Sequence, residues 1–368
     1  MDSVINRLMD SPEPSIRYKI RVKVLGEDGA SAPIRALKCE IKRSARVATL
    51  LEHRDEQGRI RPVRHVYKKW IGAHWVFATL ADIGYPSGST ELIPIRNQVF
   101  SCWLNPEATR EYICTKAPPR HRDKGVPIIC GRARRCASQQ GNALFSAVVL
   151  GLMDERCHQL ADYLVRWQWP DGGWNCDRKP SASTSSFWES LIPLRALSIY
   201  AKITGDSNAL VAVDRATEFF LAHRLFRRRR DGEIMNHQFL RLHYPCYWRY
   251  DILFALKVMA ESGVISDSRC NEALDILESK SLRAGGWPAE ERFYHTSKGQ
   301  DSGCDRVSWG GVSKKRMNEW VTADVLHVLK AAGRLHITAN QPTKLPAEIL
   351  SVEANGHGSV EDIKRKHP

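Results

Sequence analysis

Apolar residues recur along most of this chain at spacings of three and four, which is the period of a helix buried on one face. No segment alternates apolar and polar residues over a convincing length, so no sheet is expected. The pattern predicts a series of helices separated by polar turns, over residues 12–28, 32–54, 67–83, 92–104, 135–152, 156–167, 185–202, 214–226, 247–261, 270–281 and 318–332.

These helices follow one another in a repeating unit of helix, glycine turn, loop and second helix. The turn glycines Gly173, Gly232 and Gly286 lie 59 and 54 residues apart, and Gly58 is the same landmark in an earlier unit. Such a repeat is typical of helical repeat folds. The second helices are apolar on more than one face, as enclosed helices are. We therefore predict an all-α protein, an α6/α6 toroid in which about six inner helices are surrounded by outer ones.

The toroid is expected to form a single domain over residues 12–335. Residues 336–368 lose the apolar period, which predicts a disordered tail. At 43% apolar and 26% charged residues, the composition is that of a globular protein. The chain holds no apolar run of about 18 residues, and its N-terminus lacks the apolar core of a signal peptide, so we expect a cytoplasmic protein.

Ten scattered cysteines are expected to be reduced thiols, and because no C-x-x-C pair occurs, neither a zinc ribbon nor a redox motif is indicated. The formal net charge is +14, with the clearest cluster at Arg227–Arg230. That run is either a solvated turn or a site for an anionic partner, namely an acidic protein, a membrane surface, a phosphorylated ligand or, least expected, nucleic acid.

The most distinctive stretch is Leu164–Trp174, which reads LVRWQWPDGGW. It resembles the QW repeat of squalene–hopene cyclases and related terpenoid cyclases. Gly285–Trp287 is similar to the degenerate copies in those proteins and in protein prenyltransferase β subunits. The resemblance covers roughly residues 12–335 in unit architecture, is specific only at Leu164–Trp174, and implies a toroid with a central apolar cavity. We interpret the motif as structural, with the side chains or backbone of Gln168, Asp171, Gly173 and Trp174 fixing the turn.

Two functional motifs of that superfamily are not seen. Class II terpene cyclases protonate an alkene with an Asp-x-Asp-Asp acid, and this chain has no such motif. Prenyltransferases bind zinc through an aspartate, a cysteine and a later histidine, but the corresponding segment Thr184–Trp188 carries hydroxyls, and Tyr294-His295-Thr296 lacks the expected context. We therefore predict no metal ligands and no obligatory cofactor, with zinc and magnesium left open.

In a ring of helical hairpins, the N-terminal ends of the inner helices surround one mouth of the cavity. Their free N–H groups and dipoles favour an anion. Aromatic, basic and polar residues gather at these predicted helix starts, and basic residues occur there at a frequency that chance also explains. An isoprenoid or other apolar molecule, with or without a diphosphate, would suit such a mouth. The predicted ligand-binding residues are Lys69, Trp70, Arg135, Gln139, Trp188, Tyr247, Trp248, Tyr250, Trp320 and Asp324.

Three residues are candidates for catalysis. Asp251 is predicted one turn into an apolar helix, where it is either a salt-bridged or capping acid, or a general acid whose pKa burial raises. His74 is either a core histidine or a base, and Glu189 stands in the first turn of an inner helix. Cys136, Cys246, His74, His243 and Asp251 could meet at the mouth, but they lack the spacing of metal ligands.

Two functions remain open on this reading. The first is a terpenoid cyclase- or prenyltransferase-like protein that binds, and in an enzyme transforms, an isoprenoid in its cavity. The second is a non-catalytic helical-repeat protein that binds an acidic partner through its basic surface. The missing motifs favour the second, and the aromatic residues at the helix starts favour the first. A cavity lined by Trp70, Trp188, Tyr247 and Trp320 would support ligand binding.

Overall fold

A computed structural model describes residues 2–114, 125–296 and 303–335. All of them lie in one compact unit, and the predicted tail, residues 336–368, is outside the described residues. The described chain is mostly helical, as the sequence predicted. None of its helices is long and apolar enough to cross a membrane.

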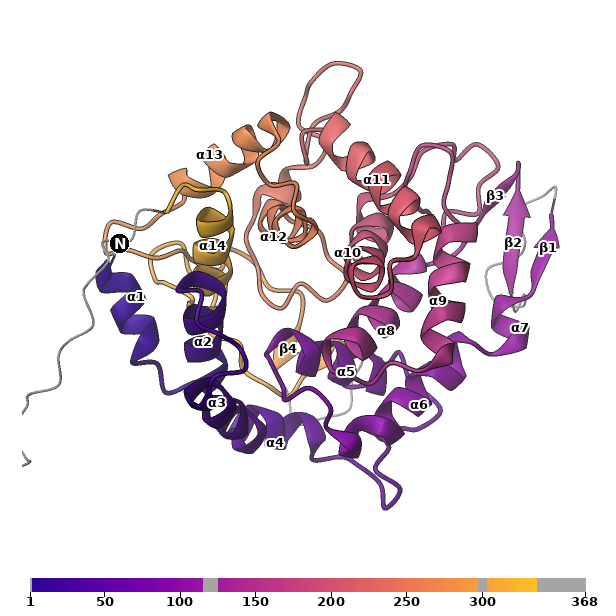
Figure 1. Cartoon of the computed structure of the whole chain (residues 1–368). Coiled ribbons are helices and arrows are strands. Elements are labelled where there is room, and N and C mark those ends of the chain that lie inside the picture. The colour runs from indigo at the N-terminus through magenta and orange to yellow at the C-terminus, as the bar shows by residue number, and fades with distance from the viewer. Residues whose placement is uncertain (1, 115–124, 297–302, 336–368) are drawn as a thin grey trace, which may run out of the picture. The chain divides into compact units, whose positions relative to one another are not determined.

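Six helical segments form an inner set that is mostly buried: α2 (Pro14–Tyr18) with the π-helix η1 (Lys19–Val24), α5 (Ala73–Asp82), α8 (Ala137–Val149), α10 (Phe187–Thr204), α12 (Ile252–Ser262) and α14 (Glu319–Ala331). Each packs on the next, from α5 through α8, α10, α12 and α14 to η1. An ion pair between Lys19 of η1 and Asp82 of α5 closes the series, which Figure 1 shows as a circle of helices.

Other helices, of which α1, α3, α9 and α13 are the most amphipathic, cover the outside of this inner set: α1 (Asp2–Met9), α3 (Ala32–Arg43), α4 (Ala45–Leu51), α6 (Ile93–Trp103), α9 (Glu155–Arg166), α11 (Ser207–Ala222) and α13 (Asn271–Ser279). Each contacts an inner helix next to it in the chain, and α3 contacts α4 as well as the inner helix α2. Shorter helices in the connections are η2 (Thr90–Leu92), α7 (Pro106–Thr109), η3 (His237–Leu240) and η4 (Ser268–Cys270).

The inner helices α8 and α10 pack closely because Gly141 faces Pro193. A Cβ atom at Gly141 would lie 2.9 Å from the backbone nitrogen of Pro193 and 3.0 Å from Ile192 Cγ2. Glycine at this position therefore lets the two backbones approach. The starts of α8 and α10 lie side by side as well, since Ser138 of α8 hydrogen-bonds Glu189 of α10.

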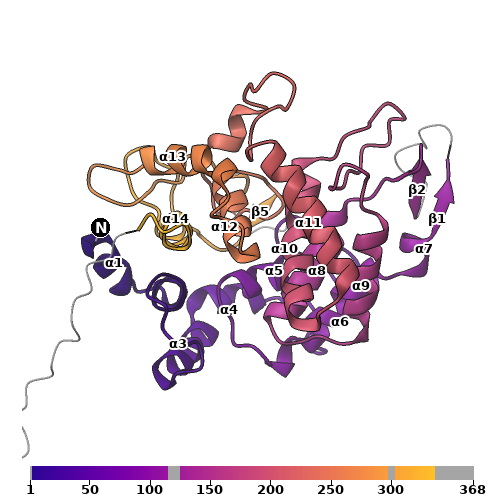
Figure 2. The same cartoon turned by 45° about the horizontal axis from the view of Figure 1, so that its top comes forward.

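The absence of strands was a wrong prediction, since two small sheets are present. Figure 2 shows the first at the edge of the unit, beyond α9. Its strands β1 (Glu111–Ile113) and β2 (Val126–Ile129) are parallel, and β3 (Arg132–Ala133) is antiparallel to β2. In the second, β4 (His295–Thr296) is parallel to β5 (Cys304–Asp305). Strands of two to four residues are too short to produce a detectable alternation.

Two inner helices begin later than predicted. We expected helices from Tyr67 and Tyr247, but α5 begins at Ala73 and α12 at Ile252. The preceding residues are apolar because they pack as loops over the helix ends, and apolar content alone does not distinguish such a loop from a helix turn. In addition, α1 was not predicted, and it packs on α2 and η1.

The glycine turns at Trp174 and Trp287 are built alike. Each indole Nε1–H donates to a carbonyl ten residues earlier, that of Leu164 at 2.8 Å and that of Leu277 at 2.7 Å. Each tryptophan backbone N–H donates to a hydroxyl of the following inner helix, Ser190 in the first turn and Thr322 in the second. Both turns thus attach the end of an outer helix to an inner one.

Candidate functional site

The predicted aromatic residues at the inner-helix starts pack against one another. Trp70 stacks on Tyr247 with ring centroids 4.1 Å apart, and Trp320 stacks on Tyr244 at 4.9 Å. Trp70 is 4% exposed and Trp320 2%. Trp188 meets Trp248 edge-on at 5.8 Å. Trp70 and Trp320 are thus buried against other rings of the protein, whereas Trp188, Tyr247 and Trp248 remain partly exposed.

The other predicted ligand-binding residues lie around the same aromatic side chains. Lys69 Nζ lies over the rings of Trp70 and Trp248. Tyr250 packs on Phe239, which also meets Trp188 edge-on, and donates its hydroxyl to the Leu225 carbonyl. Gln139 hydrogen-bonds Tyr67.

Asp251 is the N-cap of α12, and it lies before the helix rather than one turn inside it. Its Oδ1 accepts the Phe254 N–H at 2.7 Å, and its Oδ2 accepts the His243 N–H at 3.0 Å and lies 2.8 Å from His243 Nδ1. The residue is fully buried. This geometry is that of a helix cap paired with a histidine, the structural alternative considered for Asp251.

His74 lies in the core beside Trp103, whose indole N–H donates to His74 Nδ1 at 3.1 Å. His74 Nε2 has no hydrogen-bond partner among the described residues. Burial lowers the pKa of His74 to about 3. The imidazole is therefore neutral at physiological pH and carries its proton on Nε2.

The QW-like turn fastens α9 to the elements that follow it. Gln168 Nε2 donates to the carbonyls of Gly172 and Ala212, each at 2.8 Å, so it reaches the middle of α11. Asp171 accepts the backbone N–H of Ser185 at 2.7 Å and its hydroxyl at 2.6 Å. These side chains make hydrogen bonds of a structural kind.

A network of buried charges fills the middle of the inner set. Lys257 Nζ lies 3.0 Å from Asp82 and 2.9 Å from Asp324, and Lys19 Nζ lies 3.2 Å and 2.9 Å from the same two carboxylates. Arg195 adds a longer contact to Asp82 at 3.4 Å. The residues come from η1, α5, α10, α12 and α14, so one network joins five inner helices.

Each acid in the network is held in its charged form. Burial by itself would raise the pKa of Asp82, but Lys19, Lys257 and Arg195 hold that pKa well below its usual value. The pKa of Asp324 is lowered in the same way by Lys19 and Lys257. Burial would lower the pKa of Lys257, and its two carboxylate partners raise it instead. These acids therefore act as counter-charges and not as proton donors.

A cavity of about 370 Å³ opens beside this network, towards the C-terminal ends of the inner helices. One wall is apolar and includes Phe145, Val149 and Ile199. Six basic and three acidic side chains also line it, an excess of three positive charges: Lys19, Lys23, Lys38, Arg195, Lys202 and Lys257 against Asp82, Glu261 and Asp324. Of the predicted ligand-binding residues, Asp324 alone lines this cavity, which lies opposite the predicted mouth.

Lys23 is one of the lysines lining the cavity whose charge no carboxylate of the described residues balances. No hydrogen bond or ion pair of its ammonium group to a described residue is present, whereas Arg195 binds Glu261 through two nitrogens, at 2.6 and 2.8 Å. The Lys23 side chain is exposed at the rim. Even so, the surrounding protein desolvates the ammonium group, and Lys257, Arg195 and Lys19 repel it, which lowers the pKa of Lys23 although Glu261 opposes the shift.

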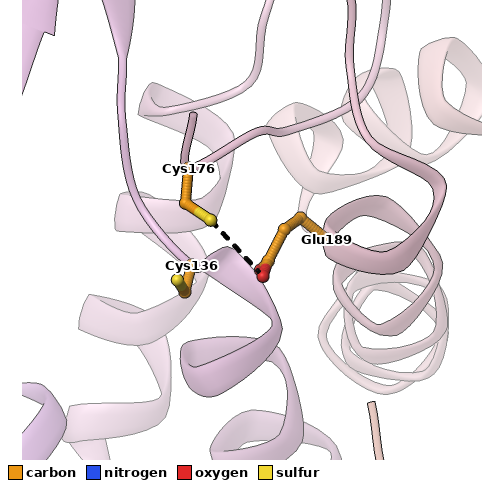
Figure 3. Close-up of side chains that lie close together, drawn as sticks. All are labelled: Cys136, Cys176 and Glu189. Atoms are coloured by element: carbon orange, nitrogen blue, oxygen red, sulfur yellow. Dashed lines mark hydrogen bonds between the residues drawn. The ribbon is translucent and has the colours of Figure 1, made fainter. Parts of the chain in front are cut away.

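Glu189 belongs to a second cluster, at the starts of α8 and α10. Its Oε2 accepts the Ser138 hydroxyl at 2.8 Å and the Ser138 N–H at 3.2 Å. The thiol of Cys176 donates to Glu189 Oε1 at 3.7 Å, and Cys136 completes the group (Figure 3). Burial raises the pKa of Glu189, and contact with Cys176, burial and Glu189 raise that of Cys136. Arg135 lies within electrostatic reach of Cys136 and Glu189.

The Arg227–Arg230 run is partly neutralised by acidic side chains. Arg227 pairs with Glu272 of α13, and Arg228 and Arg230 both pair with Asp231. Two carboxylates for four arginines leave the run with a positive excess.

The sequence prediction did not include the charged network or the cavity, because the predicted ligand-binding residues were those at the helix starts. A signal was available, since Lys257 and Arg195 each interrupt a strongly apolar helix, at ILFALKVMA and SLIPLRALS. A charge at a core-facing position requires a buried partner.

No protein-family model matches this chain, and no curated protein matches it. Solved structures with some likeness include a variant of the type II terpene cyclase MstE from Scytonema with its substrate geranylgeranyl dihydroxybenzoate. It is 15% identical, with 91% of this chain and 100% of that chain covered and a TM-score of 0.29. Another MstE variant, with the product merosterolic acid A, is 15% identical, with 83% and 100% covered and a TM-score of 0.28.

Proposed function

We propose that the protein binds a compact amphiphile, an apolar chain with an anionic head group, in the cavity at the C-terminal ends of the inner helices. The main support for this proposal is the excess of three positive charges around a partly apolar cavity. An anion would balance this excess. The volume of about 370 Å³ falls at the lower end of the roughly 300–1,000 Å³ of small-molecule sites.

The head group would lie at the rim. Lys23 makes no hydrogen bond or ion pair with a described residue that a ligand would have to break. Lys38 and Lys202 line the same cavity, and their ammonium groups donate hydrogen bonds to backbone carbonyls. Helix C-termini carry partial negative charge, which opposes an anion. The full positive charges of these three lysines, which no carboxylate balances, outweigh the partial charges of the helix ends at this rim. The chain of the ligand would then lie along Phe145, Val149 and Ile199.

An isoprenoid diphosphate has the required chemistry, and it is the ligand class that the resemblance to terpenoid cyclases and prenyltransferases implies. On this proposal the closed series of inner helices is the α6/α6 toroid of that superfamily. The proposed function is binding, because the acids that line the cavity are held as counter-charges. The head group would enter at the end of the toroid opposite the one that the sequence indicated.

The test compares three probes by isothermal titration calorimetry: farnesyl diphosphate, farnesol and inorganic diphosphate. We expect farnesyl diphosphate to bind at least about tenfold more tightly than either fragment, since each lacks one of the two recognition elements. Lys23→Met should weaken its binding about tenfold, because a charge-assisted hydrogen bond contributes roughly 1.5–3 kcal/mol.

Lys330→Met is the matched control, because Lys330 is exposed on α14 and does not line the cavity. It should bind farnesyl diphosphate like the wild-type protein. Equal affinity for farnesol and farnesyl diphosphate, or unchanged binding by the Lys23 variant, would reject an anion site at this rim.

A further inference from the structure

Three potential metal ligands converge from three separate parts of the chain. Cys136 is the N-cap of α8, Cys176 lies in the loop after the QW-like turn, and Glu189 is in the first turn of α10. One ligand atom from each lies within 4.8 Å of the other two. All three residues are partly exposed, so an ion could reach them. Figure 3 shows the side chains of Cys176 and Glu189 pointing towards one another, with Cys136 beside them.

The spacing is that of ligands sharing one ion. Zn–S bonds of about 2.3 Å and Zn–O bonds of about 2.1 Å, at a tetrahedral angle, separate a sulfur and an oxygen ligand by about 3.6 Å. Cys176 Sγ and Glu189 Oε1 are 3.7 Å apart. This pair therefore needs almost no movement to bind the same ion. A thiol hydrogen bond alone also permits this distance, so the remaining surroundings matter.

The carboxylate is already oriented for such a role. Both hydrogen bonds from Ser138 go to Glu189 Oε2 and leave Oε1 on the side of the sulfur. Partners that hold one oxygen of a ligating carboxylate are common around bound metals. Ser138 would thus fix the ligand before an ion arrives.

The charge around the cluster fits an anionic metal complex. Two thiolates and one carboxylate on a divalent ion leave one negative charge. The starts of α8 and α10 present helix N-termini to it. Arg135 is within electrostatic reach of Cys136 and Glu189, and its guanidinium has no hydrogen-bond or ion-pair partner among the described residues. Such a cation beside the cluster would balance the complex.

We propose that Cys136 Sγ, Cys176 Sγ and Glu189 Oε1 bind one zinc ion, with a fourth position open to water or to another ligand. Thiolates favour zinc over magnesium, and three protein ligands with one open position are typical of zinc sites that bind substrates. The site lies at the starts of the inner helices, whereas the cationic cavity lies towards their ends. The two proposals are therefore independent and can fail separately.

The test measures zinc binding by the full-length reduced protein in competition with a chromophoric chelator. We expect one zinc ion per chain. X-ray absorption spectroscopy should find two sulfur neighbours and lighter atoms, and the cobalt-substituted protein should show thiolate-to-cobalt charge-transfer bands. Cys176→Ser should bind zinc at least about 100-fold more weakly. Ser138→Ala, which removes one hydrogen bond behind the ligand, should bind it about tenfold more weakly.

Cys246→Ser is the matched control, since Cys246 is partly buried like Cys136 and Cys176 but lies outside the cluster. Its zinc affinity should equal that of the wild type. A reduced wild-type protein that binds no zinc, or binds zinc without sulfur neighbours, would overturn the proposal even if the variants fail to fold. The proposal would also be overturned if Cys246→Ser lost zinc binding while Cys176→Ser kept it. So would a Cys136–Cys176 disulfide that persists in reductant.

Discussion

Single charged residues decide how the interior of this protein is organised. Lys257 occupies the middle of an apolar helix, where it is 7% exposed and pairs with two carboxylates. A buried charge is tolerated only with such partners, because removing it from water costs several kcal/mol. Replacing Lys257 therefore leaves Asp82 and Asp324 with excess negative charge.

Lys257→Met should lower the free energy of unfolding by about 3–5 kcal/mol, as expected when one partner of a buried ion pair is lost. Chemical denaturation followed by circular dichroism measures the change. The exposed Lys330→Met is the control and should change the free energy by less than about 0.5 kcal/mol. A Lys257 variant within about 1 kcal/mol of the wild type would mean that the network does not stabilise the fold.

The sequence predicted part of the cluster formed by Cys136, Cys176 and Glu189. Glu189 was expected in the first turn of an inner helix, and α10 begins two residues before it. Cys176 was missed because it is in a loop. Its approach to Glu189 depends on the path of the chain after Trp174, which no spacing rule for metal ligands describes. Contacts between loop residues and helix starts result from tertiary packing, and local sequence periodicity does not predict them.

At the scale of elements, the glycine turn after α9 acts as a fixed joint between α9, α10 and α11. Gly172 has φ +98°, and a Cβ atom there would lie 2.2 Å from the Arg215 carbonyl oxygen of α11. Gly232, in the corresponding turn of the next unit, has φ +72° and nothing within 4 Å of such a Cβ. Both glycines thus have a positive φ, but they differ in their surroundings.

Gly232→Ala should destabilise the protein by about 1–2 kcal/mol, the cost of a left-handed conformation for a residue with a side chain. Gly172→Ala should lose about 1–3 kcal/mol more, because the turn must move away from α11. Thermal and urea unfolding of the two variants compare these losses. Equal destabilisation of both would show that α11 can shift without cost.

The sequence predicted where most helices lie, but it predicted their first residues less accurately. Asp251 marks the true start of α12, and it was available as an N-cap signal, but the aromatic residues before it extended the apparent helix to Tyr247. Those aromatics pack over the helix ends, as the Trp70–Tyr247 stack shows. Burial in a loop and burial in a helix produce the same apolar pattern.

At the scale of the whole molecule, the charged network makes folding depend on pH. The folded-state pKa values of Asp82 and Asp324 lie below the ordinary value for aspartate, about 3.9. Their contribution to stability is therefore complete above that ordinary value and is lost as the pH falls through the folded-state values. The raised pKa of Lys257 has the opposite sign, so its contribution is lost only as the pH rises above the ordinary lysine value.

The free energy of unfolding should thus fall steeply below about pH 4, where the unfolded chain binds more protons than the folded one. Urea denaturation at a series of pH values between neutral and acidic measures the slope. In Lys257→Met the slope should be shallower, because the two aspartates then have less depressed pKa values. Identical slopes in both proteins would assign the acid sensitivity to other carboxylates.

The closure of the inner set has a consequence for synthesis on the ribosome. Lys19 finds Asp324 only after 305 further residues have been made, and α14 packs between η1 and α12. A nascent chain that ends before α14 therefore lacks one of the two carboxylates that pair with Lys19, and Asp82 is its remaining partner. The N-terminal helices of this protein are translated first, yet η1 can gain its contacts with α14 only when this last helix has left the exit tunnel.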